Sequence, residues 1–283
     1  MRIAPVMIRY FILILLLPIL YQQLNAQTCC SGGIPIGGNV SLENNASNTW
    51  QIALTGDLNI LRTLKDERQI LDDQSRKRII YSLMIKGGYN ITNNLAVGAI
   101  FPFVRQERWI SNPAGSDYAY TQGTGDIIVV SQYQLPFSTL QNNYQVGFGS
   151  KLSSGQADLK SQEGITYNMD MQPGTGSVDW LFFGSFDHTF RKIPDMTLTT
   201  KFFYRLTGKN EDYLSGSTYQ FGNEWQLVAG VSKQWILSTH MINTSLLLKS
   251  RQMNKNEING SNISNTGGIW FDLMPSITYM PTQ

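Results

Sequence analysis

The 283-residue chain has little of what most enzymes and disulfide-stabilised proteins depend on: two cysteines, two histidines and 15% charged side chains. The cysteines are the adjacent pair Cys29 and Cys30. Adjacent cysteines cannot link distant parts of a fold, and a ring between neighbours is strained, so a disulfide framework is excluded. We interpret the pair as an exposed tail whose thiols react with each other or with another chain. A soft-metal site is the alternative, although no His or Met lies near enough in the sequence to complete it.

Long apolar runs are also missing beyond the first twenty residues. Arg2 and Arg9 precede the apolar run Phe11–Leu20, and Ala26 offers a small residue for cleavage. This pattern predicts a secretory signal peptide over residues 1–26. The run is short for a membrane span, so a permanent anchor is the weaker interpretation. Because no later segment approaches a spanning helix, this chain could cross a membrane only as a β-barrel.

The chain that follows the predicted signal peptide has no excess of basic over acidic side chains. Loss of residues 1–26 removes two of the 22 basic side chains and none of the 20 acidic ones, which leaves 20 against 20. Nucleic-acid binding needs a basic surface, so we expect no nucleic-acid partner. The sequence also lacks zinc-ligand spacing, a catalytic carboxylate pair and a nucleotide motif, and we predict no metal, no cofactor and no enzymatic activity.

The two histidines, His188 and His240, leave one catalytic alternative open. Asp187 precedes His188, as could suit a barrel-borne lipid hydrolase or acyltransferase that pairs His with Ser. No Ser is placed by the sequence beside either ring, so we favour polar residues at strand ends. Substitution of both histidines with an assay of lipid turnover distinguishes the two interpretations.

What the sequence does contain is alternation. In Val178–Asp187, every second residue from Val178 is apolar, aromatic or glycine, and the intervening positions begin and end with aspartate. This period of two predicts a β-strand, and 11% aromatic residues with 25 glycines fit a chain of strands and turns. Ten segments share the pattern: 50–60, 79–89, 95–104, 126–135, 144–152, 178–187, 196–206, 219–232, 241–249 and 269–279.

The connections between these segments alternate in length. The long ones are 65–78, 106–124, 153–173, 207–217 and 250–267, and the short ones are 90–94, 136–143, 189–195 and 237–239. Up-and-down outer-membrane barrels have this asymmetry, whereas a Greek-key sandwich has no reason for it. We therefore predict an all-β, antiparallel, transmembrane up-and-down barrel over residues 49–283, after a periplasmic lead over residues 27–48. A soluble exported sandwich is the alternative.

The end of the sequence bears on the number of strands. Outer-membrane barrels usually finish on a strand with a terminal aromatic residue, but here Tyr279 is followed by Met280 and Pro281, and proline cannot continue a hydrogen-bonded ladder. Either about ten strands close the barrel, or a final hairpin is missing and the barrel has about twelve. We favour twelve.

Charged residues on the predicted inner face are the candidates for lining the lumen. They are Asp57, Lys86, Asp126, Lys151, Asp179, Lys201, Arg205, Glu224 and Asp272. One interpretation is that they pair across a narrow barrel and brace it. The other is that they line a pathway with little net ion preference. The opposite face carries aromatic residues that we expect to contact lipid: Trp50, Tyr81, Phe103, Tyr133, Trp180, Tyr204, Trp225 and Tyr279.

Two glycine motifs, Gly123-Thr124-Gly125-Asp126 and Gly174-Thr175-Gly176-Ser177, each close a long connection before a strand. We interpret them as turn glycines with an acidic or hydroxyl side chain on the inner face. A phosphate loop is the alternative, but neither motif continues as such a loop does.

With the signal peptide and the aromatic strands, these motifs make the chain similar to a family of outer-membrane β-barrel transporters. That family includes proteins associated with phenol meta-pathway degradation, and it is distantly similar to fatty-acid and aromatic-hydrocarbon channels. The resemblance covers most of the mature chain. It implies a location in the cell outer membrane, contact with its lipids, and passive passage of a small, hydrophobic or aromatic molecule. The alternative function is a structural or surface-interaction barrel with a plugged lumen and partner-binding loops.

Overall fold

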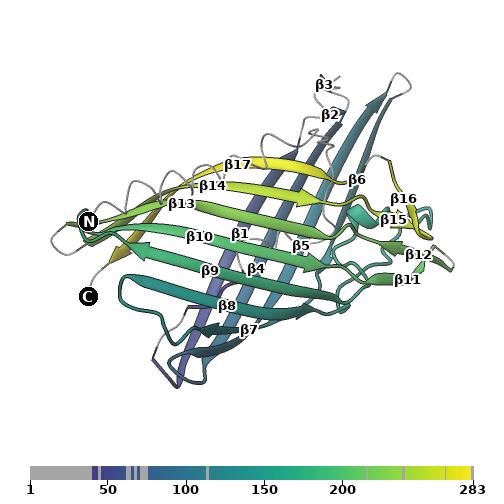
Figure 1. Ribbon diagram of the computed structural model, residues 1–283. Coiled ribbons are helices and arrows are strands. Elements are labelled where there is room, and N and C mark those ends of the chain that lie inside the picture. The colour runs from purple at the N-terminus through teal and green to yellow at the C-terminus, as the bar shows by residue number, and fades with distance from the viewer. Residues whose placement is uncertain are drawn as a thin grey trace.

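The computed structural model describes residues 40–43, 46–61, 65–66, 69–70, 76–112, 115–214, 216–237, 240–264 and 266–281. The predicted signal peptide, Cys29 and Cys30 lie outside these residues. Ten long strands form one curled antiparallel sheet (Figure 1). They are β1 (Thr49–Leu61), β4 (Arg76–Asn90), β5 (Leu95–Asn112), β7 (Ile128–Gln134), β8 (Asn142–Lys151), β9 (Asp179–Thr189), β10 (Met196–Leu206), β13 (Glu224–Leu237), β14 (His240–Met253) and β17 (Gly268–Pro281).

Each long strand pairs with the long strand next to it in the sequence. The register is regular over whole strands, as in β13 and β14, where Glu224 lies opposite Met253 and Leu237 opposite His240. Every predicted strand segment overlaps one of the ten strands, so the all-β antiparallel architecture is confirmed. Figure 1 shows the purple and blue strands β1, β4 and β5 running obliquely to the green and yellow strands, as a strongly twisted sheet does.

The sheet is a half-barrel with two edges. Within the described residues β1 pairs only with β4, and β17 pairs only with β14. These ten strands therefore curl without closing a ring. The twelve-stranded barrel remains a prediction.

The two faces of the sheet differ because side chains alternate along a strand. In β4, Tyr81, Leu83 and Ile85 are exposed on the convex face, whereas Ser82 and Met84 are buried on the concave face. We call the space enclosed by the concave face the lumen. Because neighbouring strands are antiparallel, all long connections meet at one end of the sheet, the long-connection end, and all short ones at the other, the short-turn end.

Part of the long-connection end is more ordered than the sequence suggested. Residues 106–124, predicted as a loop, instead continue β5 to Asn112 and return as β6 (Gly115–Thr124). The rings of Trp109 and Tyr118 face each other across this hairpin, with centroids 5.1 Å apart. Cross-strand aromatic pairs stabilise such ribbons, so strand structure extends beyond the length that a membrane span requires.

Short elements complete the long-connection end. A small sheet contains β11 (Lys209–Tyr213), β12 (Ser217–Gln220), β15 (Glu257–Ile258) and β16 (Ser261–Asn262), and β2 (Lys65–Asp66) pairs with β3 (Gln69–Ile70). The connection between β8 and β9 holds a single 3-10 turn, η1 (Met169–Met171). Across the described ranges, no helix is long and apolar enough to span a membrane.

The segment that precedes β1 lies inside the lumen. Val40 and Leu42 are buried in an apolar cluster with Ile100, Leu181 and Phe203, which come from β5, β9 and β10. The amide side chain of Gln132 fixes Leu42 at both ends of its peptide unit: it accepts from the Leu42 N–H at 3.0 Å and donates to the Leu42 carbonyl at 2.8 Å. The sequence did not predict this insertion.

Candidate functional site in the lumen

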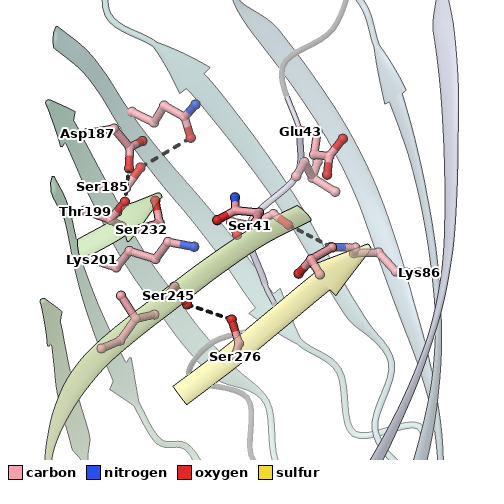
Figure 2. A pocket seen from close by; sticks show the side chains of 15 residues that line it. Ser41, Glu43, Lys86, Ser185, Asp187, Thr199, Lys201, Ser232, Ser245 and Ser276 are labelled. Carbon is pink, nitrogen blue, oxygen red and sulfur yellow. Dashed lines mark hydrogen bonds between the residues drawn. The ribbon is translucent and has the colours of Figure 1, made fainter. Parts of the chain in front are cut away.

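The short-turn half of the lumen contains a cavity of about 540 Å³ (Figure 2). Its lining comes from seven long strands and from the inserted segment. Seven lining residues carry a hydroxyl group: Ser41, Ser185, Thr199, Ser232, Ser245, Ser276 and Thr278. Among all the lining residues, only Leu42 and Leu247 are apolar. This polar lining follows from the two-residue period of a strand, because every second residue of the neighbouring strands points to the concave face.

Two lysines face this cavity from opposite walls. Lys86 of β4 donates a hydrogen bond to the Ser41 carbonyl at 2.9 Å. Lys201 of β10 has no ion pair or hydrogen bond to any described residue, and Figure 2 shows its ammonium pointing into the space between the walls. Asp187 stays against the wall, where its carboxylate accepts a hydrogen bond from the Thr199 hydroxyl at 2.7 Å. The cavity therefore offers an unpaired cation among neutral hydroxyl groups.

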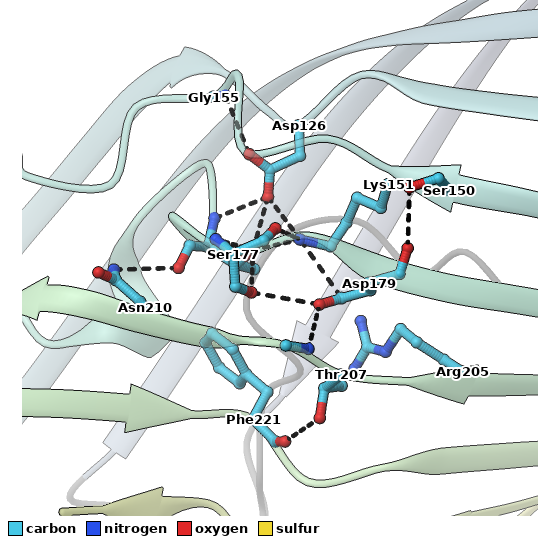
Figure 3. A network of polar contacts seen from close by, with 12 residues as sticks. Asp126, Ser150, Lys151, Gly155, Ser177, Asp179, Arg205, Thr207, Asn210 and Phe221 are labelled. Atoms are coloured by element: carbon cyan, nitrogen blue, oxygen red, sulfur yellow. Dashed lines mark hydrogen bonds and ion pairs between the residues drawn. The ribbon is translucent and has the colours of Figure 1, made fainter.

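The long-connection half of the lumen contains a buried ionic cluster instead (Figure 3). Lys151 at the end of β8 lies 2.8 Å from a carboxylate oxygen of Asp126 and 3.3 Å from one of Asp179. The three side chains are 4%, 2% and 2% exposed. Lys151 also donates to the Thr175 hydroxyl and, at 3.0 Å, to the Ser177 carbonyl. A lysine this deeply buried is stable only when it is fully paired, as it is here.

Backbone and hydroxyl groups complete the bonding of both aspartates. Asp126 accepts hydrogen bonds from the Gly155 N–H at 2.9 Å, the Thr175 N–H at 2.8 Å and the Thr175 hydroxyl at 2.7 Å. Asp179 accepts from the Ser177 hydroxyl at 3.2 Å and the Gly208 N–H at 3.0 Å. The cluster thus fastens the connection 152–178 to the ends of β8 and β9.

The glycine motifs permit this close approach. A side-chain carbon on Gly155 would lie 2.6 Å from the carbonyl carbon of Gly125, and one on Gly174 would lie 2.6 Å from that of Gly155. The two Gly-Thr-Gly motifs therefore meet through Gly155. Motif N–H groups that a phosphate loop would offer to an anion have protein acceptors here: the Thr175 N–H binds the Asp126 carboxylate, and the Gly174 N–H binds the Gln156 carbonyl.

Three further contacts hold the connection 152–178 over the lumen. Arg78 forms an ion pair with Asp170 at 2.9 Å. Gln106 donates to the Gln172 carbonyl at 3.1 Å. Met169 packs in an apolar cluster with Tyr213, Tyr219 and Phe221. Burial raises the pKa of the Tyr213 phenol, and the Asp170 carboxylate raises it further, so this ring enters the cluster in its neutral form.

A second ionic group lies on the neighbouring strands. Glu224 of β13 lies 3.1 Å from Arg205 of β10 and 2.6 Å from Arg251 of β14. Lys249 and Asp272 form a half-exposed pair at 2.8 Å. Asp57 of β1 has a buried carboxylate oxygen without a hydrogen-bond partner in the described residues.

The nine predicted lumen residues thus fall into groups. Asp126, Lys151 and Asp179 meet in one cluster, and Arg205 and Glu224 meet in another. Lys86 and Lys201 face the cavity. Asp272 pairs with Lys249, and Asp57 interacts electrostatically with the same lysine without an ion pair to any described residue. Whether any of them lines a pathway remains a prediction.

Several residues of the lumen are not predicted by the sequence pattern. Arg78 and Arg251 fall in the predicted long connections 65–78 and 250–267, but β4 and β14 extend through them. Ser232 and Ser276 lie on the predicted polar faces, but an isolated hydroxyl in a sequence does not indicate a cavity. Only the curvature of the sheet gathers them around one cavity.

The histidines have uncharged partners. His188 lies 2.7 Å from the side-chain oxygen of Asn142, and His240 lies 2.7 Å from the hydroxyl of Tyr279. Within the described part of the chain, no three His, Cys, Asp or Glu side chains are placed to hold a metal ion.

Comparison with known proteins gives a structural match alone. The sequence matches no protein-family model and, at a significant level, no curated protein. The fold is similar to the crystal structure of an outer membrane channel from Pseudomonas putida F1, with a TM-score of 0.63 and 10% sequence identity. The match covers 85% of this chain and 84% of that one. The similarity confirms the barrel-type fold.

Proposed function

We propose that this chain forms an outer-membrane β-barrel through which small molecules pass passively. The observation that carries the proposal is the convex face of the sheet. Large apolar side chains are exposed along it from one edge strand to the other: Ile52, Leu54, Leu83, Ile85, Phe101, Phe103, Phe148, Trp180, Phe182, Phe202, Leu246, Phe271 and Leu273. A soluble protein rarely exposes so continuous an apolar surface, whereas a barrel in a membrane requires one.

The opposite face supports the passage of solutes. Polar cavities inside a membrane barrel hold water, and the cavity of 540 Å³ has the size of many small-molecule sites. The similar fold of an outer membrane channel adds support.

The solute that fits this cavity is polar. The resemblance to aromatic-hydrocarbon channels implied a hydrophobic or aromatic molecule, and that identity remains a prediction. Hydroxyl, amide and charged groups dominate the lining, and an apolar molecule would bury them without hydrogen bonds. We therefore favour a hydrophilic solute.

Two measurements test the function. The full mature chain is first extracted and run on a gel with and without boiling. A folded barrel is expected to require detergent for extraction and to migrate differently from the boiled form. The protein is then reconstituted in liposomes, and the swelling rates in small polar and aromatic solutes are compared. Extraction without detergent would contradict the barrel in a membrane, and a folded barrel without flux would contradict the channel.

A second function follows from the buried ionic cluster. Because Asp126, Lys151 and Asp179 fasten the connection 152–178 over the lumen, the barrel could be closed at that end and act as a structural or surface-interaction protein. This alternative predicts a detergent-extracted, heat-modifiable barrel that passes no solute. Flux that rises when the connection is loosened would instead identify it as a gate.

A further inference from the structure

We propose that Lys201 and the hydroxyl groups around it form a binding station for small, hydroxylated carboxylate solutes. This inference rests on the proposed channel function and adds the class of solute. We call the group Lys201, Ser185, Ser232, Ser245 and Ser276 the carboxylate station. All five side chains line the cavity in the short-turn half of the lumen.

The lack of a carboxylate partner among the described residues distinguishes Lys201 from other cationic side chains of the lumen. Lys151, Arg78, Arg205, Arg251 and Lys249 each lie within ion-pair distance of a carboxylate. Lys201 has no such partner among the described residues, and it is neither fully buried nor fully exposed. An ammonium that lines a polar cavity, with no N–H group bonded to a described residue, is available for a charge-assisted hydrogen bond to an anion.

The register of β9 and β10, together with one hydrogen bond, keeps Asp187 apart from this lysine. Lys201 lies opposite Ser185, and Thr199 lies opposite Asp187. Asp187 is thus a diagonal neighbour of Lys201, and its carboxylate is bound by the Thr199 hydroxyl at 2.7 Å. Diagonal neighbours on a sheet are about 7–8 Å apart at the backbone, a separation that a long side chain can span. The two charges stay apart because the Thr199 hydroxyl holds the carboxylate and the lysine side chain points elsewhere. Figure 2 shows Lys201 turned away from Asp187 toward the cavity.

The cavity carries two lysines and two carboxylates. Lys86 approaches from the opposite wall, where a backbone carbonyl is its partner. Glu43 and Asp187 also line the cavity and balance the formal charge of the two ammonium groups. The attraction for an anion is therefore local to Lys201, because Thr199 holds the Asp187 carboxylate against the wall.

The hydroxyl groups select among anions. A hydroxyl both donates and accepts, so it can bind a carboxylate oxygen or the hydroxyl of a solute. Ser245 and Ser276 already bond to each other at 2.6 Å, whereas Ser232 has no side-chain partner in the described residues. Such a wall matches a short chain that carries one carboxylate and several hydroxyls. Gluconate is a probe of this kind, and sorbitol is its uncharged counterpart.

The experiment compares the uptake of gluconate and sorbitol by liposomes that contain the full mature chain. We expect Lys201→Met to lower gluconate uptake about fivefold and to leave sorbitol uptake within about twofold, because only gluconate uses the charge. Lys201→Arg keeps the charge and is expected to keep most of the preference. Heat-modifiable migration verifies that each variant is folded.

Lys233→Met is the matched control. It removes one positive charge from a residue that lies over the Trp235 ring, 4.3 Å from the ring centroid, and does not line the cavity. It is expected to leave the gluconate-to-sorbitol ratio unchanged. Equal changes for Lys201→Met and Lys233→Met, or equal losses for both solutes, would overturn the carboxylate station.

Failure of the channel and failure of the station can be told apart. If the wild-type barrel passes neither solute, the proposed channel function is wrong. Calorimetric titration of gluconate into the folded protein in detergent then decides the station by itself. Heat of binding that is lost in Lys201→Met supports it, and no heat with the wild-type protein overturns it.

Discussion

The two halves of the lumen use the same residue types in opposite ways. At the long-connection end, Lys151 is buried between two aspartates and saturated with hydrogen bonds. At the short-turn end, Lys201 lines a cavity rich in hydroxyl groups and pairs with no carboxylate in the described part of the chain. Both lysines occupy inward positions of neighbouring parts of one sheet. The difference shows that a charge on the inner face of a barrel can brace the structure or face the solvent of the lumen.

The two lysines differ because different segments of the chain pack over the two ends of the lumen. The connection 152–178 folds over the long-connection end and brings Thr175, Ser177 and the N–H of Gly155 to the ionic cluster. Among the described residues, the segment that enters the lumen beside the short-turn cavity is the short stretch Val40–Glu43. Water is excluded where the long connection packs, so the charges there must be paired, and it remains where the cavity is open.

The largest expected effect separates the two lysines. Lys151→Met leaves Asp126 and Asp179 buried without their cation, and this should destabilise the barrel by about 3–5 kcal/mol. Lys201→Met is the matched control, and its cost should be below about 1 kcal/mol because no ion pair is lost. The measurement is the temperature at which the folded form disappears on a gel. Equal shifts for the two variants would show that the contrast between the halves is wrong.

The next effect concerns the packing of the glycine motifs. Gly155→Ala places a carbon 2.6 Å from the backbone of Gly125, and overpacking of this kind costs about 1–3 kcal/mol. Because the strain falls on the connection 152–178, proteolysis within this segment should become faster. Gly56→Ala is the control, since nothing lies within 4 Å of the added carbon. Unchanged proteolysis in Gly155→Ala would mean that the cluster does not depend on this close approach.

A smaller and more local effect is expected at the inserted segment. Gln132→Ala removes both amide contacts to Leu42, and the loss of two buried hydrogen bonds should weaken local order by about 1–3 kcal/mol. Hydrogen exchange at the Leu42 N–H should accelerate, and single-channel conductance should rise. Ser131→Ala, the adjacent position on the other face of β7, serves as the control. A conductance that stays the same would indicate that this segment does not limit passage.

The smallest effect is expected in the cavity wall. Ser276→Ala removes an exposed hydroxyl whose one side-chain bond to a described residue is to Ser245, so the stability should change by no more than about 0.5 kcal/mol. The uptake of gluconate relative to sorbitol should nevertheless fall slightly, because a solute contact is lost. A large loss of stability would show that this wall braces the barrel as the ionic cluster does.

Much of the fold could be predicted from alternation alone. Ten strands, their inward and outward faces and the sorting of the connections by length all followed from the period of two and from turn residues. The prediction failed at 106–124, where Trp109 and Tyr118 extend a hairpin that was assigned to a loop. The predicted inner-face charges were located, but their grouping was not. Pairs such as Asp126 with Lys151 join residues 25 positions apart through a folded connection, and alternation carries no information about such contacts.

The sequence by itself determined that the chain is a series of antiparallel strands with one apolar and one polar face, because side-chain direction in a strand depends only on local geometry. Tertiary structure decided which polar residues are buried and which face open space. It joined the two Gly-Thr-Gly motifs through Gly155, inserted Leu42 into the lumen and left Lys201 without an ion pair to any residue that the structure describes. The physical reason is that the ion pairing and the hydration of a side chain depend on which distant segment packs over it. Only the folded chain determines which segment that is.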